Sequence, residues 1–180
     1  MKKLKFYLQK IYRLSVSFDK QEQLVWDDIK QIHLDAEWRH GVFEREKFIE
    51  TNFEISDGRQ ALFYYMLYDS YFHCRVKILE NFPIELTTDL FVLAAHFNNL
   101  LNNGVVVVNV NSSFIEYHQK RDLLIPLLYK GEIHGQITRH FNTARDIYSA
   151  FERLVEEQEA PAIIIADLLK KNDEEKTNEK

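Results

Sequence analysis

The sequence contains few of the residues that stabilise secreted proteins or build long loops. Only one of its 180 residues is cysteine, Cys74, so no intramolecular disulfide can form. Five glycines and three prolines are few for this length, which argues against long irregular loops. No stretch approaches the roughly 20 apolar residues of a membrane-spanning helix. We therefore expect a folded protein in the cytoplasm, without a membrane span.

Basic residues are also in the minority. Lysine and arginine number 23 against 28 aspartates and glutamates, which gives a formal net charge of −5. A general nucleic-acid binder would show a basic stripe and a high isoelectric point, so we expect no nucleic-acid partner. The start of the chain is basic, but Lys10 and Arg13 interrupt what would have to be the apolar core of a signal sequence.

Residues 59–159 show the clearest succession of elements. The pattern predicts strands at Ala61–Tyr68 and Tyr71–Leu79, a helix at Thr87–Leu101, strands at Val105–Val110 and Phe114–His118, and a long helix ending near Glu159. The order β-β-α-β-β-α indicates an α+β domain whose helices cover one face of an antiparallel sheet.

Local signals support this assignment. Phe72, Cys74, Val76 and Ile78 alternate with polar residues, which predicts a strand with these four side chains in the core. Asp57-Gly58 favours a tight turn with positive φ, and Asp69-Ser70 links two strands. Gly104 suits the left-handed position that follows a helix.

The ends of the chain give weaker patterns. Residues 4–12 predict an amphipathic helix with basic residues elsewhere around it, and we expect it to dock on its own domain rather than on a membrane surface. The alternation at residues 14–18 allows a short strand, a second helix is expected from about Asp27, and a first sheet strand from Phe43 to Phe53. We assign residues 1–34 to a helical extension, residues 35–169 to one domain and residues 170–180 to a disordered charged tail.

Residues that could carry out catalysis or bind metals do not form a recognisable set. The sequence has no phosphate-binding loop, no paired-cysteine spacing and no nucleophile motif. His134 and His140 are six residues apart, which places them on different faces of a helix. Cys74 falls in the core row of its strand, where a packed thiol is expected. We therefore predict no catalytic residue, no metal and no cofactor.

Aromatic strand residues beside basic ones can also bind RNA by stacking on bases. Tyr64, Tyr65, Tyr68 and Tyr71, together with Arg75 and Lys77, could form such a surface. The acidic balance of the chain argues against it, and an aromatic sheet face covered by a helix is the preferred interpretation.

The segment from about Asp35 to Leu169 resembles the YbjN-like proteins, which have the fold of type III secretion chaperones. The matching parts are the strand containing His73-Cys74-Arg75-Val76-Lys77, a helix ending in Phe97-Asn98-Asn99-Leu100-Leu101-Asn102-Asn103-Gly104, the hairpin Val105–Tyr117 and the long terminal helix. The resemblance implies the order α-β-β-β-α-β-β-α with about five strands. It also implies a binding or chaperone-type module, often dimeric, with no catalytic residues.

These observations favour a non-enzymatic protein-interaction module, a chaperone-like protein or regulatory adaptor of the bacterial cytoplasm, with a protein partner or as a homodimer. The expected contact surface follows Pro161, where five large apolar residues fall within seven positions. They are Ile163, Ile164, Ile165, Leu168 and Leu169. Two alternatives stay open: a small-molecule-binding or enzymatic domain with a cleft between the sheet and helix 87–101, and an RNA-binding sheet.

Overall fold

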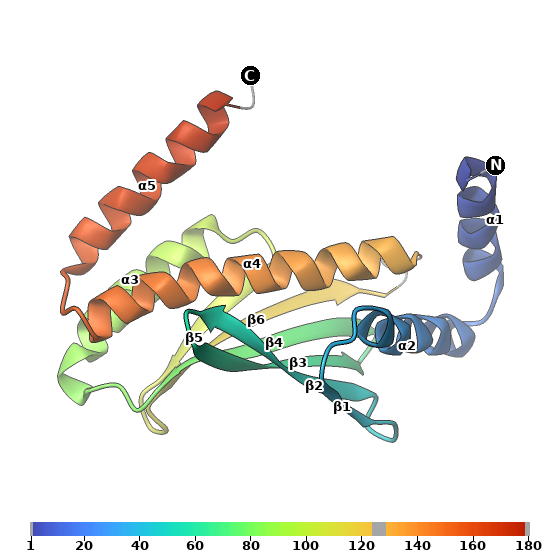
Figure 1. Cartoon of the computed structure of the whole chain (residues 1–180), viewed down its shortest axis with the longest axis horizontal. Helices are drawn as coiled ribbons and strands as arrows, with labels where there is room; N and C mark the ends of the chain where they lie inside the picture. Colours follow the sequence, from blue (N-terminus) through green and yellow to red (C-terminus); the bar gives the residue numbers. More distant parts are fainter. Residues whose placement is uncertain (1, 124–128, 179–180) are drawn as a thin grey trace.

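The computed structural model describes residues 2–123 and 129–178. In chain order the elements are α1 (Lys2–Ser15), α2 (Phe18–Asp35), β1 (His40–Phe43), β2 (Phe48–Ser56), β3 (Arg59–Tyr68), β4 (Tyr71–Glu80), the short 3₁₀ helix η1 (Ile84–Leu86), α3 (Thr87–Leu100), β5 (Gly104–Asn109), β6 (Phe114–Asp122), α4 (Lys130–Val155) and α5 (Pro161–Asn178). The predicted α+β class, with an antiparallel sheet and helices packed on one face, is confirmed (Figure 1).

The sheet has six strands rather than the five expected, in the order β1-β2-β3-β4-β6-β5, and every neighbouring pair is antiparallel. The additional strand is the short β1. The sequence predicted one strand from Phe43 to Phe53, but Phe43 ends β1 and Phe48 begins β2. A turn separates them, in which Lys47 takes a positive φ of 48°. The alternation of residues 43–53 is imperfect because this segment contains the turn of a hairpin and not one continuous strand.

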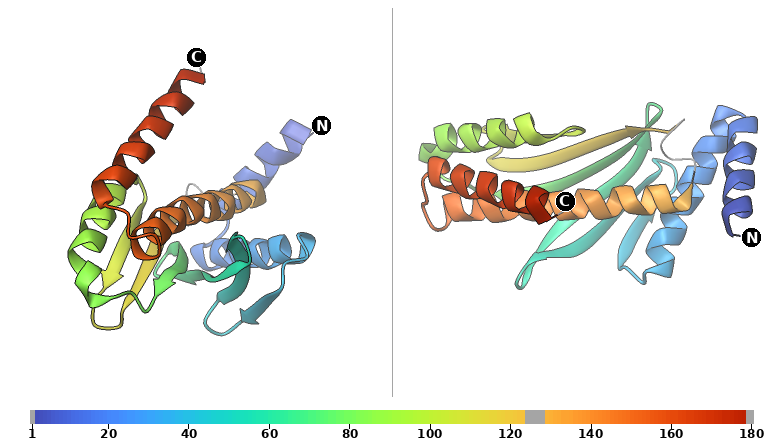
Figure 2. Two further views of the ribbon diagram at one scale, coloured as in Figure 1. Left: turned by 60° about the vertical axis from the view of Figure 1, so that its left-hand side comes forward. Right: turned by 90° about the horizontal axis from the view of Figure 1, so that it is seen from above.

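The core lies between the sheet and the long helix α4. The predicted inner row of β4, from Phe72 to Ile78, is buried, and so is the row from Ala61 to Leu67 of β3. The stripe of α4 that includes Ile137 and Phe151 packs against them. Figure 2 shows α4 across the sheet, with α3 beside it. Burying each large apolar side chain stabilises the fold by roughly 1.5–3 kcal/mol.

The N-terminal boundaries differ from those expected. Helix α2 begins at Phe18, nine residues before Asp27, and residues 14–18 form no strand because α1 extends to Ser15. Gln21 takes a buried position on α2 and interrupts the apolar pattern that would have revealed this part of the helix. Trp26 and Ile29 lie in the core, so the domain includes α2 and is not limited to residues 35–169.

The C-terminal segment also differs. Helix α5 continues to Asn178, where a disordered tail was expected from residue 170, and residues 179–180 lie outside the described residues.

Turns follow the sequence with one exception. Gly58 has φ +70°, and Asp69 and Ser70 both have positive φ, as tight hairpins require. The prediction for Gly104 was wrong. Among the glycines of the described residues only Gly58 has a positive φ, so Gly104 does not adopt the left-handed conformation. A Cβ at Gly104 would lie 2.6 Å from Cε2 of the buried Tyr117. Glycine is needed there for close packing.

Candidate functional site

The face of the sheet that points away from α4 is the most distinctive surface of the molecule. Because strand residues alternate, β3 and β4 direct aromatic and charged side chains away from the core. Among the described residues no helix covers this side (Figures 1 and 2). We call this surface the open face and define it by Tyr64, Tyr68, Tyr71, His73, Arg75, Lys77, Glu116, His118 and Lys120.

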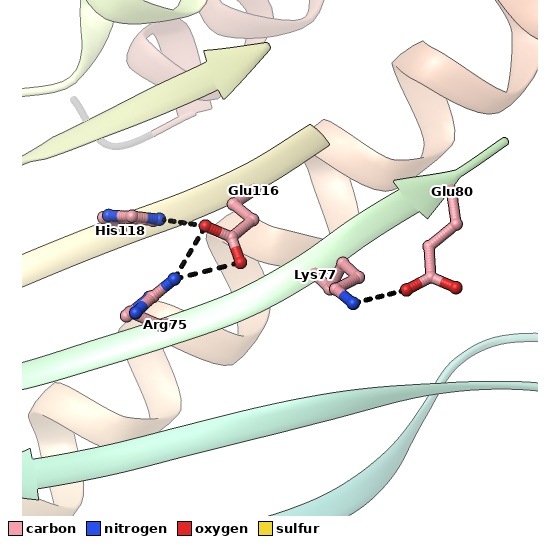
Figure 3. A network of polar contacts seen from close by, with 5 residues as sticks. All are labelled: Arg75, Lys77, Glu80, Glu116 and His118. Atoms are coloured by element: carbon pink, nitrogen blue, oxygen red, sulfur yellow. Dashed lines mark hydrogen bonds and ion pairs between the residues drawn. The ribbon is translucent and has the colours of Figure 1, made fainter. Parts of the chain in front are cut away.

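Glu116 is at the centre of the open face. Its carboxylate accepts hydrogen bonds from Nη2 of Arg75 at 2.8 and 3.1 Å and lies 2.7 Å from Nε2 of His118 (Figure 3). Arg75 of β4 stands directly opposite His118 of β6 in the sheet register, which brings both to the same carboxylate. Burial alone would raise the pKa of Glu116, but the contacts with His118 and Arg75 outweigh it and lower that pKa.

The other cations of the open face are also engaged. Lys77 is ion-paired with Glu80 (Figure 3). Nζ of Lys120 lies 4.9 Å from the ring centre of Tyr71, a cation–π contact. Arg75 and Lys77 are therefore already neutralised by carboxylates of the same chain.

Aromatic side chains line the turn between β3 and β4. Tyr68 is 70% exposed, and its ring centre lies 6.2 Å from that of His73. Tyr71 also contacts His73, with ring centres 6.0 Å apart. Partial burial, as the largest effect, lowers the pKa of His73. The neutral form of this histidine is thus favoured within an aromatic cluster.

A shallow hollow of about 740 Å³ adjoins this cluster, where β6 extends past the beginning of β5. Tyr71, His73 and Lys120 line one side, and Asn102, Asn103 and Gly104 line the other. The hollow continues the open face towards the α3–β5 connection. Its lining offers hydrogen-bond donors and the aromatic ring of Tyr71.

The predicted contact surface on α5 divides into two parts. Ile164 is fully buried, and Ile165 and Leu168 pack against the same core. Ile163 and Leu169 are about half exposed. The chain's own helices therefore cover the centre of this stripe, and its two exposed residues lie at opposite ends.

The six residues of the predicted RNA-binding sheet also separate. Tyr65 points into the core and is fully buried, whereas Tyr64, Tyr68 and Tyr71 share the open face with Arg75 and Lys77. The expectation that a helix covers the aromatic face was wrong for the second group. Both rows of β3 are apolar or aromatic, but only the inner row is buried and the outer row is partly exposed.

The cleft expected between the sheet and helix 87–101 is filled. Leu90, Leu93, Ala94 and Phe97 of α3 are buried in the core. Phe97 contacts Phe151 of α4, with ring centres 6.2 Å apart. The side chains that would line such a cleft are thus used in packing.

Metal-ligating and nucleophilic residues do not converge within the described part of the chain. No group of three or more His, Cys, Asp or Glu residues there could hold a metal ion. Cys74 is fully buried, and burial raises the pKa of its thiol well above its ordinary value. Its predicted place in the core row is confirmed.

Sequence reasoning missed the Glu116 network, because Glu116, His118 and Lys120 lie on a strand recognised only from its hairpin position. Their alternation with Ile115 and Tyr117 was the available signal. The burial of His140 was also missed, since histidine is ambiguous in an apolar pattern.

Comparisons with known proteins add little. No family model matches the chain, and no curated protein matches it. The chain is similar to the crystal structure of YbjN from E. coli, described as "a putative transcription regulator", with a TM-score of 0.49. Sequence identity is 10%, over 68% of this chain and 87% of that chain. Within the described ranges, no helix is long and apolar enough to cross a membrane.

Proposed function

We propose that this protein is a non-enzymatic protein-interaction module, a chaperone-like protein or regulatory adaptor of the bacterial cytoplasm, and that a partner polypeptide binds its open face. The observation that carries the proposal is a sheet face that no described helix covers, on which Tyr68 is exposed and Tyr64 and Tyr71 are partly exposed. Protein contacts favour tyrosine and arginine, and both occur here.

The charges of the open face favour a polypeptide over a nucleic acid. A surface that binds phosphates needs cations available for them. Here Arg75 is paired with Glu116 and Lys77 with Glu80, so a phosphate would have to compete with a carboxylate at each position. A partner polypeptide that packs apolar side chains against the tyrosines does not need these cations and meets no such competition.

Strand addition at the β5 edge is disfavoured, so the partner is expected on the face of the sheet. Asn98 of α3 occupies both outward backbone groups of Val106 in β5. A peptide that extended the sheet there would have to displace this side chain.

The test is retention of proteins from native lysate by the tagged full chain, compared with Tyr68→Ser/Lys120→Glu. Both substituted side chains are exposed, so circular dichroism should show an unchanged fold. The matched control is Phe91→Ser, an exposed aromatic of α3. We expect a protein that the wild type and the control retain and the open-face variant loses.

Equal retention by all three proteins would contradict the proposal. Fluorescence anisotropy with single-stranded oligouridine tests the RNA alternative directly. Tight binding that Tyr68→Ser/Lys120→Glu abolishes would replace the protein-binding interpretation. Light scattering of the same variants shows whether the partner is a second copy of the chain.

A further inference from the structure

Helix α1 exposes an apolar stripe that its own domain does not cover. Leu4, Leu8, Ile11, Tyr12 and Leu14 are each between 52% and 65% exposed. On a helix with 3.6 residues per turn these five positions fall within one arc of about 160°. We call them the outer stripe. The sequence suggested that this surface docks on the domain, and the structure shows it facing outward.

Two ion pairs hold the opposite side of α1 to the domain. Arg13 is paired with Asp28 of α2, and Nζ of Lys10 lies 2.7 Å from Oε1 of Glu132 in α4. Arg13 follows Leu4 by nine positions, which is about 180° of helix rotation. The Arg13 contact therefore directs the outer stripe away from α2. Figures 1 and 2 place α1 at the outer end of the molecule, where a flat surface could reach it.

The charge of α1 identifies the kind of surface. Residues 2–15 contain five lysines or arginines and no acidic residue. Removing these five charges leaves the rest of the chain with a net charge of −10. Positive charge is thus concentrated on a helix that exposes a wide apolar arc. Amphipathic helices that lie in the surface of anionic bilayers combine these two features.

A second copy of α1 is a poorer occupant for the outer stripe. Packing two such helices together would bring two basic segments without acidic residues side by side, and their lysines would repel each other, whereas a bilayer with acidic headgroups attracts them. We propose that α1 is an interfacial helix whose outer stripe enters the surface of an anionic lipid bilayer. The domain would then be held at the membrane surface through a helix that does not span it.

Vesicle flotation of the full chain tests this. The probes are vesicles of phosphatidylcholine alone and vesicles with about 40% phosphatidylglycerol, at low and high salt. We expect the wild type to float with the anionic vesicles, and binding to fall several-fold as salt screens the headgroups. Leu8→Asp/Ile11→Asp should lower the partition coefficient about tenfold or more, because its apolar surface is lost.

Leu34→Asp is the matched control, since Leu34 is an equally exposed apolar residue, on α2. It should bind like the wild type, and all three proteins should melt at similar temperatures. The proposal is overturned if the wild type stays unbound, or binds neutral and anionic vesicles equally. It is also overturned if Leu8→Asp/Ile11→Asp binds normally, or lowers the mass of the lipid-free protein in light scattering, which would assign the stripe to a second copy.

Discussion

The side chain of Asn98 hydrogen-bonds both backbone groups of Val106. Nδ2 of Asn98 donates to the Val106 carbonyl at 3.0 Å, and the Val106 amide donates to Oδ1 of Asn98 at 2.7 Å. Val106 lies at the middle of β5, which is an edge strand of the sheet. Edge strands with free backbone groups invite pairing with other chains. The side-chain amide of Asn98 thus satisfies the two outward backbone groups of Val106. It hinders another strand from pairing with β5 at this position.

Replacing Asn98 with Ala should therefore have two effects. We expect the free energy of unfolding to fall by about 1–3 kcal/mol, because two partly buried backbone groups lose their partners. We also expect concentration-dependent self-association, measured by size-exclusion chromatography. Asn99→Ala is the control, because Asn99 is exposed on the same helix. If Asn98→Ala were as stable as Asn99→Ala, water would be replacing the Asn98 side chain at Val106 without loss of free energy.

The amount of structure that the sequence predicts depends on how regular its pattern is. The inner row from Phe72 to Ile78 alternates without error, and its burial followed directly. Helix α2 was found only in part, because Gln21 occupies a core position that the pattern reserves for apolar residues. Periodicity assigns a residue to a face, but it does not show whether a second layer covers that face. The open face was therefore beyond prediction, although its tyrosines, Arg75 and Lys77 were recognised as a possible surface.

The same limit explains the two ends of the chain. Residues 4–12 and Ile163–Leu169 both show apolar stripes at helical spacing. In the structure the first is exposed and the second is mostly covered by α3 and α4. Whether an apolar stripe is exposed or covered depends on long-range packing, which the local sequence pattern does not indicate. Long-range packing places each segment opposite to what its local pattern favoured.

Two buried histidines predict a loss of stability in mild acid. Burial, as the largest effect, lowers the pKa of His33 from 6.5 to about 4 and that of His140 from 6.5 to about 3. Both bind protons more weakly in the folded state than in the unfolded state. The free energy of unfolding is therefore unaffected by these histidines above about pH 6.5. It falls as the pH drops towards 4, because the unfolded chain then binds protons that the folded protein does not. Each can lower the free energy of unfolding by up to about 1.4 kcal/mol per pH unit.

Urea denaturation at pH 7.5, 6 and 5 measures this dependence. His140→Phe should flatten it, because the ring contacts Tyr65 and Tyr117 in the core and phenylalanine preserves an aromatic ring without a titrating group. His134→Phe, an exposed position on the same helix, should leave the slope unchanged. A slope that is identical in His140→Phe and the wild type would assign the acid sensitivity to other groups.

Two glycines should respond in opposite ways to alanine. A Cβ at Gly104 would lie 2.6 Å from the ring of the buried Tyr117, so Gly104→Ala should cost about 1–3 kcal/mol through overpacking. Gly135 lies within α4, and its Cβ would meet only Nη1 of Arg139 at 3.5 Å. Gly135→Ala should stabilise the protein by about 0.5–1 kcal/mol, because alanine is the better helix former. Thermal melting compares both with the wild type, and a stabilised Gly104→Ala would contradict the packing argument.

Aspartate substitutions on α5 distinguish an interface from a core. Ile164 is fully buried against α3 and α4, whereas Ile163 and Leu169 are about half exposed. Ile164→Asp places a charge in the core and should lower the free energy of unfolding by about 3 kcal/mol or more. Ile163→Asp and Leu169→Asp should stay within about 0.5 kcal/mol of the wild type. Urea denaturation measures stability, and light scattering measures mass. If Ile164→Asp instead kept its stability and changed only its mass, the centre of the stripe would belong to a contact between chains, and the helices that cover it here would have to release it.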